Sequence, residues 1–232
     1  MIRRIRTLVI YFLRRVLFSL TGLLYVLLAG VLWRVFFDPY YLTPNVDYYI
    51  ALIAVFGALF AFLSTLTIAA YAHQAIHYPV LVRLPRRIEY LAAVLISAFC
   101  FGTLLQVCLA ILATYNGPHF TVDKILQLPL VWLPVNVLAA VLGLHASNLV
   151  TVGWSRAVVY GVLLALALGQ STVVGPVSGL VFWPVRAVFE AIRAGFFDPV
   201  QALAPIAILL YAVVLFAVAA RLFAGKDLAL TE

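Results

Sequence analysis

The sequence predicts an all-α membrane protein that crosses the bilayer six times, and two observations lead to this fold class. First, 66% of the 232 residues are hydrophobic and 10% are charged, whereas a soluble domain carries about 25% charged residues. Second, the chain repeats apolar stretches of about 20 residues, the length that crosses the hydrocarbon core as a helix. These stretches and their short loops occupy nearly the whole sequence, so we expect one transmembrane domain over 1–232.

Residues 1–15 are predicted to form an amphipathic helix ahead of the first span. Apolar side chains gather on one side of its helical wheel, and four of its five arginines lie mostly opposite. The apolar side comprises Ile2, Ile5, Leu8, Val9, Phe12 and Leu13, and the opposite arginines are Arg3, Arg4, Arg14 and Arg15. We expect this helix to lie in the inner membrane interface, with its arginines near anionic lipid headgroups. The alternative is a basic tail that only orients the chain.

Six spans follow, and the charges of their loops predict the orientation of the chain. The spans are predicted at residues 16–37, 50–72, 86–114, 129–150, 157–175 and 202–223. An even number of spans places both termini on one side. If that side is the cytoplasm, the inner segments carry eleven Lys and Arg residues and the outer segments four. This bias follows the positive-inside rule, so we expect a multi-pass protein of the plasma membrane, the inner membrane in a two-membrane cell, with cytoplasmic termini.

The segment between the second and third spans, 73–87, is the most informative inner loop. Pro79 breaks any helix that continues from span two, and Pro85 suits the first position of the third helix. Glu89 then falls in the early turns, where a carboxylate interacts favourably with the helix dipole. The segment is therefore predicted to be a structured elbow that carries Arg83, Arg86 and Arg87 at the cytoplasmic surface. It is either a docking site for a soluble partner or an ordinary basic loop.

A second amphipathic helix is predicted on the outer side, within the outer interfacial segment 176–199. Residues 184–195 begin with proline and end with glycine, which are helix start and stop signals. Apolar residues recur at helical spacing, and the charged residues Arg186, Glu190 and Arg193 lie opposite at spacings that allow ion pairs. We expect this helix to pack on the outer membrane surface before the last span.

Polar side chains inside the spans are candidates for a translocation path. These are Gln106, Asn136, His145 and Gln170. Because polar groups are costly when they face lipid, each is expected to face another helix or a cavity. Two interpretations remain open, a substrate path at a dimer interface or interhelical hydrogen bonds.

The cysteines and histidines indicate neither a disulfide nor a metal site. Cys100 and Cys108 fall in one predicted span and would lie about 12 Å apart along a helix, too far to bridge; we expect buried thiols. His73 and His77 share a helix face, as metal ligands would, but no third ligand lies nearby in the sequence. We expect them to make polar contacts at the cytoplasmic rim.

No catalytic motif occurs, so the chain is not expected to be an enzyme. A Gly-x-x-x-x-Gly-Lys-Ser/Thr phosphate loop and a His-Glu-x-x-His zinc motif are both missing, and the aspartates all fall in loops or the tail. The net charge of +7 is explained by the inner loops, so nucleic acid is not an expected partner. Any ATP hydrolysis, with its ATP and Mg²⁺, would belong to a partner subunit.

The layout resembles the membrane subunits of type-2 ABC exporters, the ABC-2 permease family. The resemblance covers the whole chain, and its closest local match is Leu84-Pro85-Arg86-Arg87-Ile88-Glu89-Tyr90-Leu91, which is similar to the pattern that opens the family's third span. The end of span two differs, because Ala72-His73-Gln74-Ala75-Ile76-His77 lacks the glutamate and Gly-Thr that family members usually have there.

The resemblance implies a permease that dimerises with a second copy or a paralogue and binds one cytoplasmic ABC ATPase subunit. Contacts that couple the permease to this ATPase would come from His77, Arg83, Arg86, Arg87 and Glu89. Gln106, Asn136, His145 and Gln170 would line the path. The alternative from a different class is a non-transporting structural subunit of a larger membrane complex; haem-export subunits are a lesser alternative. The substrate is left open.

Overall fold

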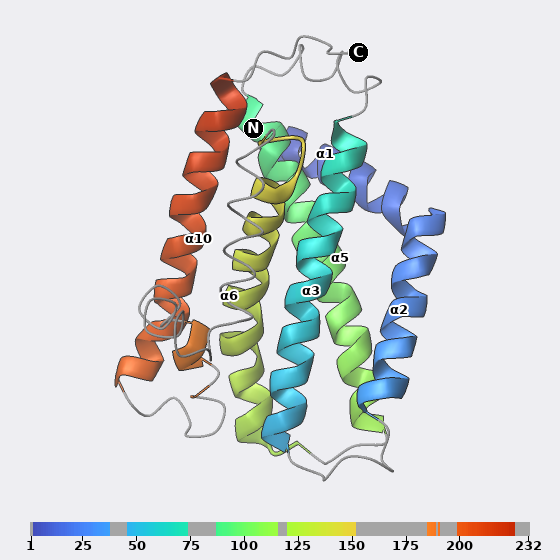
Figure 1. Ribbon diagram of the computed structural model, residues 1–232, viewed down its shortest axis with the longest axis vertical. Coiled ribbons are helices and arrows are strands. Elements are labelled where there is room, and N and C mark those ends of the chain that lie inside the picture. Colours follow the sequence, from blue (N-terminus) through green and yellow to red (C-terminus); the bar gives the residue numbers. More distant parts are fainter. Residues whose placement is uncertain are drawn as a thin grey trace, which may run out of the picture.

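The computed structural model describes residues 2–37, 46–73, 87–115, 120–151, 185–188, 190 and 199–225, and within these ranges the regular structure is helical (Figure 1). The long helices are α1 (Ile2–Leu17), α2 (Leu20–Phe36), α3 (Val46–Ala72), α5 (Arg87–Tyr115), α6 (Val122–Ala146) and α10 (Pro199–Gly225). The predicted fifth span, 157–175, lies outside the described residues.

Four of the described helices are long and apolar enough to cross a membrane. They comprise residues Val46–Ala72, Arg87–Tyr115, Lys124–Ala146 and Ala202–Gly225. The pair α1 and α2 qualifies as a fifth span when it is taken as one unit bent by 68°. The described part of the chain is therefore an all-helical, multi-pass membrane bundle with four or five candidate spans.

The helices alternate in direction, as a chain that crosses repeatedly must (Figure 1). Helix α2 runs away from the end of the bundle where α1 lies, α3 returns to it, α5 runs away and α6 returns. Helix α10 runs parallel to α6, which the six-span order requires of spans four and six. We call the end that holds α1, the start of α5 and the last turn of α10 the α1 end. Helix α3 packs along both α5 and α6.

The span boundaries agree with the sequence best for α5 and least for α6. Helix α5 covers 87–115 where 86–114 is predicted, whereas α6 begins at Val122 and ends at Ala146 where 129–150 is predicted. Pro129 and Pro134 both lie inside α6, because a membrane helix tolerates proline where neighbouring groups satisfy the freed carbonyls. The helix ends early because Ser147 adopts an extended backbone, with φ −88° and ψ 156°.

Helix α1 forms where the amphipathic helix 1–15 is predicted, and its apolar side packs against the protein core. Phe12 and Val16 are buried, and Ile5, Leu8, Val9 and Leu13 pack against the same core. The contact is mainly with α5, since Phe12 stacks edge-on against Tyr90 at 5.6 Å. The apolar side of α1 thus belongs to the protein core, and its outward side carries the arginines.

The bend between α1 and α2 is built by local capping and close packing. The Ser19 hydroxyl accepts a hydrogen bond from the Gly22 backbone N–H at 3.1 Å and so caps α2. A Cβ at Gly22 would overlap the Val16 carbonyl oxygen, so the tight approach requires glycine. The Thr21 and Tyr71 hydroxyls share a 2.8 Å hydrogen bond that attaches the bend to α3.

The prediction that the two cysteines are buried is wrong. Cys100 and Cys108 are exposed on α5 rather than buried. Both therefore lie on the part of α5 that the other described helices leave uncovered. Each is a thiol small and apolar enough for a lipid-facing position.

Candidate functional site

A polar cluster lies where α3, α5 and α6 meet inside the bundle. The Gln106 side chain donates from Nε2 to the Ile53 carbonyl oxygen at 3.1 Å, and its Oε1 accepts from Asn136 Nδ2 at 2.5 Å. Asn136 Nδ2 also lies 3.5 Å from Thr103 Oγ1. Gln106 and Asn136 are both fully buried. Two predicted path residues therefore come together and connect three helices.

Small residues on α3 and its neighbours make the cluster possible. A Cβ at Gly57 would meet Gln106 Oε1 at 2.7 Å and the Cδ and Nε2 atoms at still shorter range. Gly102 of α5 lies against the Ala61 backbone, and a Cβ at Gly102 would approach the Ala61 Cα to 2.7 Å. Gly143 of α6 lies against the Thr65 side chain, and a Cβ there would approach the Thr65 Cβ to 2.7 Å. Helix association in lipid depends on such close approach, since there is little hydrophobic driving force between helices.

Some buried polar atoms of α3 and α6 remain unsatisfied. Within the described part of the chain, Asn136 Oδ1, Ser64 Oγ and Trp132 Nε1 are buried without a hydrogen-bond partner. An unsatisfied buried polar group costs about 1–3 kcal/mol.

His145 makes a separate contact nine residues further along α6. Its Nε2 lies 2.9 Å from the Leu215 carbonyl oxygen on α10, and the His145 carbonyl oxygen accepts from the Thr151 hydroxyl. At 1.5 Å per residue, His145 is about 13 Å along the helix from Asn136. It therefore joins α6 to α10 and is not part of the Gln106 cluster.

The charged residues at the start of α5 form the second candidate site. Glu89 is buried, with 5% of its side chain exposed, and its Oε2 lies 3.9 Å from Nη1 of Arg4, which is 53% exposed. Arg87 Nη1 donates to the Ala224 carbonyl oxygen in the last turn of α10 at 3.3 Å. A guanidinium at the carboxyl end of a helix interacts favourably with the unpaired carbonyls there. These contacts join α1, α5 and α10 at the α1 end.

Two further ion pairs lie away from the α1 end, one between two helices and one within a single segment. Lys124 Nζ at the start of α6 lies 2.6 Å from Asp47 Oδ1 at the start of α3. Arg186 Nε and Glu190 Oε1 are 2.7 Å apart, which confirms the ion pair that the spacing of the outer helix predicts. Val188 beside them is buried, so this segment packs against the bundle.

Four of the predicted site residues cannot be placed in the structure. His77, Arg83, Arg86 and Gln170 lie outside the described residues. The structure adds Arg4, Thr103 and Gly57, which sequence reasoning did not assign to either site. Gly57 faces a polar residue on another helix, and such a contact has no pattern in the local sequence. Arg4 can be recognised from the sequence only as one of several arginines near the start of the chain. No group of three His, Cys, Asp or Glu residues that could hold a metal ion occurs in the described ranges.

Comparison with known proteins leaves the family open. No protein-family model matches this chain, and no curated protein or solved structure matches it either.

Proposed function

We propose that the chain is the membrane-spanning subunit of an ATP-driven exporter of the ABC-2 type, with ATP hydrolysed by a separate cytoplasmic subunit. The observation that carries this proposal is the junction of α1, α5 and α10 through Arg4, Glu89 and Arg87 at the arginine-rich end of the bundle. A soluble partner that binds there would contact three helices at once.

The proposed coupling follows from how these helices pack. A displacement of the α5 start would act on α1 through Glu89 and on α10 through Arg87, while α5 itself packs along α3. Nucleotide-dependent closure of the ATPase subunits would then bias the bundle between two states that differ in these contacts.

The Gln106 cluster would be the closed part of the path. In the present arrangement Gln106 and Asn136 bond to each other and to α3, and both are sealed from the surface. An interhelical hydrogen bond in a membrane contributes about 0.6 kcal/mol on average, so separating α5 from α6 at this level requires little energy per bond. A polar substrate group would then replace the protein partner.

The alternative is a structural subunit of a larger membrane complex. One observation favours it: Gln106, Asn136 and His145 each make a hydrogen bond between helices of the same chain. Such bonds are sufficient to account for polar residues in a bundle that does not transport.

The test is to purify the tagged chain in mild detergent from its native membrane, identify the bound subunits by mass spectrometry, and measure ATP hydrolysis. We expect a phosphate-loop ATPase in a fixed ratio. Reconstituted hydrolysis should fall when Glu89→Gln removes the buried charge at constant volume. Glu190→Gln is the matched control, because it removes an exposed carboxylate away from the α1 end.

The outcomes separate the two functions. A stable set of other membrane subunits without any ATPase would overturn the exporter and support the structural subunit. A bound ATPase whose hydrolysis responds equally to both variants would retain the exporter but reject the coupling role of Glu89.

A further inference from the structure

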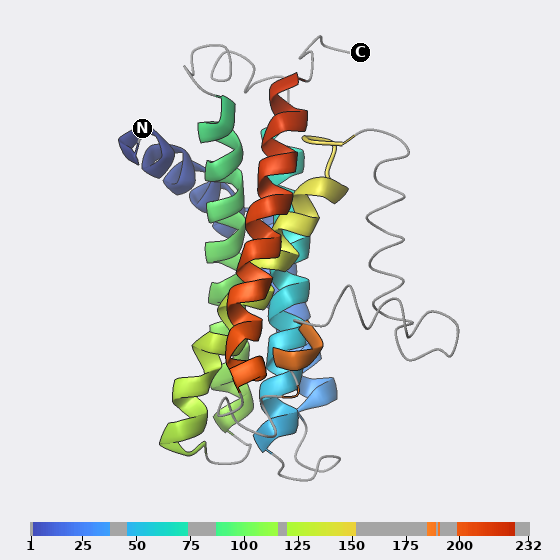
Figure 2. The ribbon, with the colours of Figure 1, turned by 90° about the vertical axis from the view of Figure 1, so that its left-hand side faces the viewer.

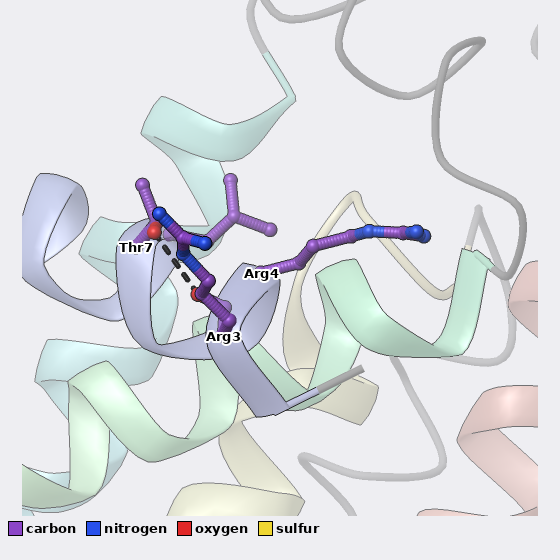
Figure 3. Close-up of a pocket in the computed structure, with 4 residues that line it drawn as sticks. Arg3, Arg4 and Thr7 are labelled. Carbon is purple, nitrogen blue, oxygen red and sulfur yellow. Dashed lines mark hydrogen bonds between the residues drawn. The ribbon is translucent and has the colours of Figure 1, made fainter.

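A shallow, open pocket of about 310 Å³ lies beside the first two turns of α1. Its described lining consists of Arg3, Arg4, Thr7 and Leu8. Figure 3 shows the two arginine side chains leaving the helix in different directions, with Arg3 beside Thr7 and Arg4 extending away from both. Arg4 reaches toward the start of α5, where Glu89 lies 3.9 Å away. Small-molecule sites range from roughly 300 to 1,000 Å³, so this pocket is at the lower end of that range.

The charges around the pocket select an anion. Arg3, Arg4 and Arg6 are all exposed within two turns of one helix, and Glu89 lies too far from Arg4 for a hydrogen bond. The Thr7 hydroxyl already donates to the Arg3 carbonyl oxygen at 2.9 Å, so the free donors are guanidinium groups. Guanidinium groups bind phosphate oxygens through short, charge-assisted hydrogen bonds.

The surroundings of the pocket favour a lipid over a free anion. Helix α1 leaves the bundle sideways, as Figure 2 shows, so its outward side runs along the expected membrane surface. The helix also exposes Ile10 and Leu17, and Phe18, directly after its last residue, has 88% of its surface exposed. Apolar side chains interspersed with arginines are typical of a helix at the boundary between headgroups and acyl chains. Leu8 adds an apolar wall to the pocket.

We propose that this pocket binds the phosphate of an anionic phospholipid, held by Arg3 and Arg4, with the acyl chains passing along the exposed apolar residues of α1. This lipid site does not depend on the proposed export function, although both use Arg4. It places a lipid headgroup on the same arginine that lies beside Glu89, so the charge of the membrane acts directly on the contact between α1 and α5.

The experiment uses the full chain in a neutral detergent and follows its thermal unfolding by tryptophan fluorescence. Dihexanoyl-phosphatidylglycerol, dihexanoyl-phosphatidylcholine and inorganic phosphate are titrated separately. We expect phosphatidylglycerol alone to raise the unfolding midpoint saturably. Each arginine near an anionic headgroup contributes about a fivefold gain in binding, so Arg3→Gln with Arg4→Gln should raise the required lipid concentration by roughly 30-fold.

Two further variants keep the proposal falsifiable if the double variant unfolds easily. Arg3→Gln alone leaves the Arg4–Glu89 contact intact and should weaken phosphatidylglycerol binding roughly fivefold. Arg6→Gln with Arg14→Gln removes the same charge from the same helix outside the pocket and should weaken binding far less. The site would be overturned if both double variants weakened phosphatidylglycerol binding equally, or if Arg3→Gln left that binding unchanged. It would also be overturned if inorganic phosphate raised the unfolding midpoint as much as phosphatidylglycerol does, or if phosphatidylglycerol did not raise it.

Discussion

Adding a single methyl group at Gly57 tests whether the Gln106 cluster determines how α3, α5 and α6 pack. In Gly57→Ala the new Cβ would meet Gln106 Oε1 at 2.7 Å, and real Cβ atoms are essentially never closer than 3.0 Å to such a neighbour. The Gln106 side chain must therefore move. Its movement breaks the bonds to the Ile53 carbonyl oxygen and to Asn136.

The expected change in stability follows from three terms. The two interhelical hydrogen bonds contribute roughly 1 kcal/mol together, and overpacking adds about 1–3 kcal/mol. Alanine in a helix interior returns about 1 kcal/mol relative to glycine. We therefore expect Gly57→Ala to lower the free energy of unfolding by about 1–3 kcal/mol.

The assay is equilibrium unfolding by titration of sodium dodecyl sulfate into mixed micelles, followed by far-UV circular dichroism. Gly30→Ala is the matched control, because a Cβ at Gly30 of α2 meets no atom within 4 Å; this variant should be neutral or slightly more stable. Adding Gln106→Ala to Gly57→Ala removes the overlap, so the double variant should be no less stable than Gln106→Ala alone. Equal stability of Gly57→Ala and Gly30→Ala, or additive losses in the double variant, would refute the packing argument.

Three further predictions use the same purified chain. Lys124→Ala should lower the free energy of unfolding by about 0.5–1 kcal/mol, because its ion pair with Asp47 is only partly shielded from water; exchanging the two residues should restore most of the loss, and failure to do so would contradict the pair. His145→Phe removes the 2.9 Å contact with α10 and should cost about 0.6–1.7 kcal/mol in the detergent titration, whereas an unchanged midpoint would show that the contact is unimportant. In a cysteine-free background, an impermeant maleimide should label Thr7→Cys from the cytoplasmic side and Tyr115→Cys from the outer side. Thr7 belongs to α1 and Tyr115 is the last residue of α5, and α1 and the last turn of α5 lie at opposite ends of the bundle (Figure 1). Labelling of both positions from one side would refute this topology.

The sequence by itself determined the fold class and the main helices, because a bilayer imposes strong local rules. Backbone polar groups cannot remain unpaired in lipid, so a sufficiently long apolar run must be helical. The prediction for the third span, 86–114, accordingly agrees with α5 to within one residue at each end. The ion pair between Arg186 and Glu190 was equally predictable, since it depends only on helical spacing.

Only the tertiary structure decided which side of each helix faces protein and which faces lipid. Span residues are apolar all round, so their periodicity carries little information about orientation; Cys100 and Cys108 consequently lie outside the core where burial was predicted. The apolar side of α1 fits a lipid surface and a protein surface equally well, and packing against α5 selected the protein. The bond between Gln106 and Asn136 depends on the space left by Gly57 on a third helix, and such a three-helix arrangement has no signal in any local stretch of sequence.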